Sequence, residues 1–123
     1  MPLVLSNSAA VHETPNAVMR TLAAPSVGAI ELAVWEVAMT DGQAGPTHSV
    51  DHEQVWVVLH GALSVHLGDE TTLQVGPGDA AILPAGDERR IVAGGNVRAL
   101  VSSMAAPSVH TQDGGRRALP WAA

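Results

Sequence analysis

The chain has 123 residues, a formal net charge of -6 at pH 7 and no cysteine. This length supports a single domain with a hydrophobic core, and the missing thiols exclude disulfides, zinc–thiolate sites and cysteine nucleophiles. The six basic residues are all arginines, so no lysine amine is available for Schiff-base chemistry. Tyrosine and phenylalanine are absent as well, which leaves acid–base chemistry to His, Asp or Glu.

Charge and hydropathy also limit the partners. An acidic chain without a basic, aromatic-rich patch is not expected to bind nucleic acid. No apolar run approaches the roughly 18 residues of a membrane span, and Met1–Ala10 lacks the basic start of a secretory signal. We therefore expect a cytoplasmic protein with no membrane partner. The lysine-free composition, rich in Ala, Val and Arg, is typical of a GC-rich bacterial genome.

Short runs of Val, Ile and Leu, separated by Gly, Pro, Asp and Asn, predict an all-β chain. A short helical turn is expected near Ser6–Val11, and turns at Asp41-Gly42, Gly68–Glu70, Gly76–Gly78 and Gly94–Asn96. Regularly spaced short strands favour a sandwich or jelly roll. The expected strands, in chain order, are Ala17–Leu22, Ala29–Met39, Gln54–His60, Leu63–Leu67, Thr71–Val75, Ala80–Leu83, Arg90–Ala93 and Val97–Met104.

Two of these strands are apolar on both faces. Every residue of Val55–Leu59 is apolar, and Ala29–Met39 is interrupted only by Glu31 and Glu36. One face can meet the barrel interior, but the other then needs a separate cover. We expect that cover to be a second subunit in a homodimer. The alternative is a monomer in which Met1–Leu22 covers the outer face.

The chain is predicted to form one domain, residues 1–123, with a core at about 29–104. Residues 1–28 form an N-terminal strand segment and residues 105–123 a C-terminal tail. The tail is polar and rich in glycine at Gly114–Arg117 and apolar at Leu119–Trp121. It is interpreted as a linker followed by an anchor, with Trp121 docked on the barrel or on a partner subunit. A disordered terminus is the alternative.

Two segments framed by glycine and proline form a recognisable pattern. The first runs from Gly42 to Gly61 and contains His48, Val50 and Gln54; the second runs from Gly78 through Pro84 and Gly86 to Arg89. This spacing resembles the two motifs of the cupin superfamily over roughly residues 29–104. The resemblance implies a double-stranded β-helix, or jelly-roll barrel, with a metal site inside it.

The family's four metal-ligand positions fall on His48, Val50, Gln54 and Arg89. Of these, only His48 is unchanged: Val50 offers no donor atom, Gln54 offers a neutral amide, and Arg89 brings a charge that repels cations. This set does not make a standard divalent-metal site, so no cofactor is expected. A non-standard metal site built from His48, His52 and Gln54 is the alternative.

Positions 48, 50 and 54 share parity, so these side chains can share the inner face of the barrel. Arg89 in an apolar interior would need an anionic partner, which a small carboxylate-bearing ligand could supply. Gln54, Trp56 and Val50 would form the rest of the ligand-binding wall. The alternative places Arg89 at the surface, paired with Asp87 or Glu88.

Four functions follow from this pattern. The first is a metal-independent cupin that binds a small anionic molecule. The second is an enzyme, such as an isomerase, cyclase or epimerase, in which His48 is the general base, oriented by Asp51 or Glu53, and Arg89 stabilises negative charge. The third is a metal-dependent dioxygenase or isomerase with non-standard ligands. The fourth is an interaction module with a filled barrel.

Overall fold

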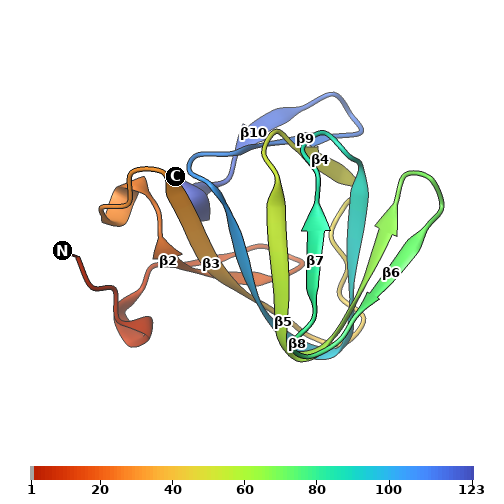
Figure 1. Cartoon of the computed structure of the whole chain (residues 1–123), viewed down its shortest axis with the longest axis horizontal. Helices are drawn as coiled ribbons and strands as arrows, with labels where there is room; N and C mark the ends of the chain where they lie inside the picture. The colour runs from red at the N-terminus through yellow and green to blue at the C-terminus, as the bar shows by residue number, and fades with distance from the viewer. Residues whose placement is uncertain (1) are drawn as a thin grey trace.

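The computed structural model describes residues 2–123, which form an antiparallel all-β fold (Figure 1). The expected helical turn is shorter than predicted, a single 3-10 turn at Ser6–Ser8. In chain order the elements are η1 (Ser6–Ser8), β1 (Val11–Glu13), β2 (Val18–Ala23), η2 (Pro25–Val27), β3 (Leu32–Met39), β4 (His48–Val50), β5 (Gln54–Leu67), β6 (Thr72–Val75), β7 (Ala80–Leu83), β8 (Arg89–Met104), β9 (Ser108–Thr111), β10 (Arg116–Ala118) and η3 (Pro120–Ala122).

The two longest strands, β5 and β8, belong to both halves of the fold. The first half of β5 and the second half of β8 join β7 and β3–β2 in one sheet. Their other halves join β6 on one side and β4–β9–β10 on the other. In Figure 1 the long strands converge at the bottom, while β4, β9 and β10 close across the top. The predicted jelly-roll barrel is confirmed.

The prediction of four separate strands in these two regions is wrong, because both strands continue through a bend. The pairing register between β5 and β8 shifts around Gly61, which has a φ of 76°. Strand β8 bends at Gly95, which has a φ of 78°. A Cβ at Gly61 would collide with the carbonyl oxygen of Asn96. The glycines therefore let the two strands bend together between sheets, rather than ending the strands as the sequence predicts.

Three short strands, β4, β9 and β10, cover the end of the barrel and were not predicted. The residues expected to form a linker at 114–117 instead belong to the β9–β10 hairpin. The tail then ends in η3, where Leu119 and Ala122 are buried in the core. Trp121 packs against the same core, and its carbonyl oxygen accepts a hydrogen bond of 2.8 Å from Thr21 Oγ1. The tail is thus part of the barrel wall.

The core follows the alternation of the strands. In β3 the buried positions are Ala33, Trp35, Val37 and Met39, while the intervening side chains point outward. On the outer face, several large apolar side chains remain exposed, including Ile82 at 64% and Met104 at 60%. Among residues 2–123, no helix has the length and apolar character needed to cross a bilayer.

Candidate functional site

A cavity of about 470 Å³ lies inside the barrel. Its walls come from the β1–β2 turn, the inner faces of β3, β4 and β5, and the C-terminal tail, and they are mainly apolar. The side chains that line it are those of Thr14, Pro15, Asn16, Ala17, Met19, Trp35, Val37, Met39, Pro46, His48, Val50, Gln54, Trp56, Ile91, Val109, Thr111, Arg117, Ala118, Leu119, Pro120 and Trp121, with Gly45.

The cavity brings together four of the residues that the sequence singles out: His48, Val50, Gln54 and Trp56. His48 and Val50 lie on β4, and the other two lie at the start of β5. Although a bend at residues 51–53 separates the two strands, positions 48, 50 and 54 still face the same interior. Arg89, the fifth predicted residue, does not line the cavity.

Gln54 is the hydrogen-bond centre of this wall and is only 2% exposed. Its Oε1 accepts one hydrogen bond of 2.8 Å from Arg89 Nη2 and another of 3.2 Å from Trp56 Nε1. Both partners can only donate, so the oxygen of the amide must face them. The amide nitrogen therefore lies on the other side, and within residues 2–123 no acceptor bonds to it. This leaves a donor available at the cavity wall.

Arg89 lies inside the protein with 1% of its surface exposed. Besides the bond to Gln54, its Nη1 donates to the carbonyl oxygen of Asp87 at 3.0 Å, and its Nε has no partner among the described residues. Burial lowers the pKa of Arg89 to about 10, although the charge of Asp87 opposes this shift. In residues 2–123 the guanidinium forms no ion pair. The surface ion pair with Asp87 or Glu88, which the sequence offers as the alternative, is not formed. The guanidinium lies behind Gln54, which lines the cavity and is hydrogen-bonded to it.

His48 presents a free ring nitrogen. Its Nδ1 lies 2.8 Å from the carbonyl oxygen of Pro46, and because a carbonyl only accepts, Nδ1 carries the proton. In the neutral ring Nε2 is then an unprotonated acceptor, with no hydrogen-bond partner in the described chain. Burial lowers the pKa of His48, the bond to Pro46 opposes this, and the charge of Arg89 lowers it further. The imidazole is therefore held neutral near pH 7.

The acidic residues close to His48 in sequence do not orient it. Asp51 accepts a hydrogen bond of 2.8 Å from the backbone nitrogen of Ser108 and lies 3.8 Å from Arg116. Its other neighbour is His52, whose Nε2 is 4.0 Å away. His52 does not line the cavity. The orienting role that the sequence assigned to Asp51 or Glu53 is filled instead by the carbonyl of Pro46.

The residues at the family's metal positions do not fit a divalent cation. Val50 has no ligand atom, and the oxygen of Gln54 already accepts two hydrogen bonds. The charge of Arg89 lies next to that oxygen and would oppose a cation. In the described part of the chain, no three His, Cys, Asp or Glu side chains are arranged to hold a metal ion.

Several cavity residues were not found from sequence, and Arg117 is the most polar of them. Thr111 and Ala118 also belong to this group. All three lie in the tail, where β9 and β10 pair across the end of the barrel. These residues reach the cavity because their strands pair with strands far away in the sequence. A short polar segment gives no local sign of such pairing.

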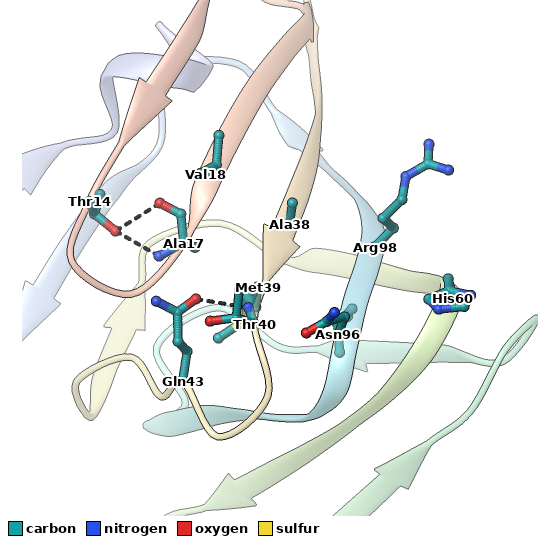
Figure 2. A pocket seen from close by; sticks show the side chains of 11 residues that line it. Thr14, Ala17, Val18, Ala38, Met39, Thr40, Gln43, His60, Asn96 and Arg98 are labelled. Atoms are coloured by element: carbon teal, nitrogen blue, oxygen red, sulfur yellow. Dashed lines mark hydrogen bonds between the residues drawn. The ribbon is translucent and has the colours of Figure 1, made fainter.

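A second hollow of about 420 Å³ lies beside the β1–β2 turn and the 40–43 loop (Figure 2). Its polar side chains are largely satisfied by the protein itself. Gln43 bonds to the backbone of Thr40 and Pro15, and Arg98 makes two hydrogen bonds to Glu36. Of the predicted site residues none lies here, and His60 stands apart at one edge (Figure 2). The barrel cavity is the stronger candidate.

Comparison with protein families matches residues 35–103 to the cupin domain. The chain is a cupin. The match spans β3 to β8, the strands that carry His48, Gln54 and Arg89. The cupin superfamily membership inferred from the glycine and proline frame is confirmed. Comparison with curated proteins found no matching sequence.

Solved structures with the same fold include enzymes. The polyketide cyclase RemF from Streptomyces resistomycificus is 27% identical with a TM-score of 0.73, over 85% of this cupin and 79% of that chain. An RmlC-like cupin from Shewanella frigidimarina is 16% identical with a TM-score of 0.72, over 83% and 88% of the two chains. Oxalate decarboxylase from Bacillus subtilis is 16% identical with a TM-score of 0.75, over 85% of this cupin and 29% of that chain.

Proposed function

We propose that this cupin binds a small, largely apolar molecule in the barrel cavity, without a standard metal centre. The observation that carries the proposal is the orientation of the Gln54 amide. Its oxygen is held by Arg89 and Trp56, so its nitrogen can donate to an electron-rich oxygen on the ligand. His48 Nε2 supplies an acceptor on the same wall.

The charge of Arg89 favours a ligand with anionic character. It lies in a desolvated interior without a carboxylate partner in residues 2–123, where electrostatic interactions are stronger than in water. Gln54 stands between this charge and the cavity. A carbonyl, enolate or carboxylate oxygen that accepts from the Gln54 amide would be stabilised by both groups.

Filling the cavity should abolish ligand binding. Val50 is 1% exposed and lines the cavity, so Val50→Phe places a ring in the ligand's space. With 2-naphthamide as a neutral probe, we expect calorimetry to show binding to the wild type and at least a tenfold loss in this variant, about 1.4 kcal/mol. The matched control is Val92→Phe, because Val92 lies on the opposite face of β8 from buried Ile91 and Ala93.

Both variants must first be shown to fold, since overpacking a core costs about 1–3 kcal/mol. Circular dichroism and thermal unfolding provide this check. Unchanged binding of 2-naphthamide in a folded Val50→Phe variant would show that the probe binds elsewhere and would contradict the proposed cavity. Loss of binding in Val92→Phe alone would contradict it equally.

A second candidate function is an enzyme, an isomerase, cyclase or epimerase, in which His48 acts as general base. The observation that favours it is the unprotonated Nε2, which the bond from Nδ1 to Pro46 fixes in place. The nearby Gln54 amide and Arg89 charge could stabilise the negative charge that develops when a proton is removed. The likeness to a polyketide cyclase at 27% identity supports the cyclase among these three activities.

We further propose that the chain forms a homodimer through the outer face of β3, β5, β7 and β8. In this face Val34, Ser102, Val55 and Ile82 make one cross-strand row. The described N-terminal segment extends the sheet beyond β3 and leaves Ile82 64% exposed. The Glu36–Arg98 pair at the same face is closed within the chain, so these two residues add no net charge that would repel a second copy.

The dimer is tested by sedimentation equilibrium. We expect a mass of two chains for the wild type and of one chain for Ile82→Lys, because a charge in an apolar interface is left unpaired. Arg90→Glu is the control, since Arg90 is exposed on the outer face of the other half of β8. A wild-type monomer at high protein concentration would contradict the proposal.

A further inference from the structure

The ladder at the end of the barrel directs one arginine toward the cavity. Val50 pairs with Val109, and Val109 pairs with Arg117, so the three residues form one row across β4, β9 and β10. All three line the cavity. Paired residues of neighbouring strands point to the same face of a sheet. Arg117 therefore continues the inner face of the barrel to its rim.

Arg117 is the one charged residue with a fixed charge among those that line the cavity. In residues 2–123 it forms no ion pair and no side-chain hydrogen bond. Asp113 is close enough for the charge of Arg117 to contribute to the lowered pKa of that carboxyl group, which results first from bonds by Thr111 and Gly115. Asp113 nevertheless forms no ion pair with Arg117, and its Oδ1 accepts both of those bonds.

The neighbouring arginine shows the contrast. Arg116 pairs with His110 on the ladder, one residue out of phase with the inward row, and its Nη2 lies 3.8 Å from Asp51 Oδ2. It does not line the cavity. Two adjacent arginines of the same short strand thus differ in face and in partner. Only one of them is positioned to meet a bound molecule.

We propose that Arg117 binds the anionic group of an amphipathic ligand at the rim of the cavity. This rests on the proposed binding function and names its ligand class: an apolar ring system that carries a carboxylate. The ring system fills the apolar cavity beside the buried Gln54, and the carboxylate meets the exposed Arg117. The backbones of Val50 and Arg117 are two strand spacings apart, or about 10 Å. A fused-ring carboxylate is long enough to contact the side chains of both residues.

The sequence placed the anion-binding guanidinium at Arg89. The structure buries Arg89 behind Gln54 and puts Arg117 on the cavity wall instead. An exposed arginine can bind a carboxylate with two parallel hydrogen bonds. Its side chain stays solvated until the ligand binds. The two arginines therefore have separate tasks. Arg89 acts through the Gln54 amide, and Arg117 contacts the ligand.

The test compares 2-naphthoate with 2-naphthamide, which differ in charge but little in shape. Calorimetry is done on the wild type, Arg117→Gln and Arg116→Gln. We expect the wild type to bind 2-naphthoate more tightly than the amide, and this advantage to fall with added sodium chloride. Arg117→Gln should weaken 2-naphthoate binding about tenfold and leave 2-naphthamide unchanged. Arg116→Gln should change neither.

The outcomes separate this inference from the binding function itself. If 2-naphthamide binds the wild type but 2-naphthoate has no advantage, or loses none in Arg117→Gln, the role of Arg117 is wrong and the cavity still binds ligands. An equal loss in Arg116→Gln would show general attraction to a basic surface and would also overturn the role. If neither probe binds the wild type, both the inference and the proposed function fail.

Discussion

Replacing Gln54 with leucine is expected to lower the free energy of unfolding by about 2–3 kcal/mol. The substitution removes the acceptor of Arg89 Nη2 and of Trp56 Nε1 at once. Arg89 would keep only its bond to the carbonyl of Asp87, and its charge would remain buried without compensation. Urea unfolding followed by tryptophan fluorescence measures the change.

The matched control is Gln74→Leu. Gln74 is an exposed β6 residue whose Oε1 accepts from Ser64 Oγ at 3.0 Å, so the same chemical change is made without a buried charge. Its effect should stay within about 0.5 kcal/mol. The double variant Gln54→Leu with Arg89→Met removes donor and acceptor together and should recover most of the lost stability. If Gln54→Leu costs no more than Gln74→Leu, Gln54 does not hold the buried charge.

Gln54 also shows how much of the site the sequence predicts. The glycine and proline frame predicts which positions share the barrel interior, since strand parity is a local property of the chain. It therefore identifies His48, Val50, Gln54 and Trp56 as cavity residues. It does not predict that one amide oxygen accepts from both Arg89 and Trp56, because that arrangement depends on the packing of β8 against β5.

The errors have a common physical origin. The sequence predicts that strands end near Gly61 and Gly95, whereas both glycines are bends within strands that continue into a second sheet. A glycine with positive φ is compatible with both, and only the partner strand decides between them. The tail was missed for a related reason: β10 has three exposed residues and no apolar alternation, so its place on the cavity wall comes entirely from its pairing with β9.

The largest expected effect on activity follows from the assignment of His48 as general base. Kemp elimination of 5-nitrobenzisoxazole provides a probe, because it needs only removal of the C3 proton. As the base takes that proton, the N–O bond breaks and a cyanophenolate forms, with no co-reactant. We expect the wild type to accelerate this reaction and His48→Gln to lose about 100-fold of the rate. Absorbance of the phenolate measures it.

The pH dependence tests the same assignment. His48 must be neutral to accept a proton at Nε2, and burial, with a further contribution from the Arg89 charge, lowers its pKa below the ordinary value of 6.5. The rate should therefore rise as pH increases through that lowered pKa and remain level at neutral pH. The folded state also binds protons less readily at this ring than the unfolded state does. Stability should fall as pH drops through the same range, so rates are compared only where the protein stays folded.

His66→Gln is the control, because His66 is an exposed imidazole on β5 that bonds to Thr72 Oγ1. It should leave the rate unchanged. The wild type is measured after dialysis against a chelator, which should not lower its rate. Stoichiometric iron, manganese, nickel or zinc in the purified protein that disappears in His48→Ala would contradict a metal-independent base. A wild-type rate equal to that of His48→Gln would leave binding, and not proton transfer, as the function of the cavity.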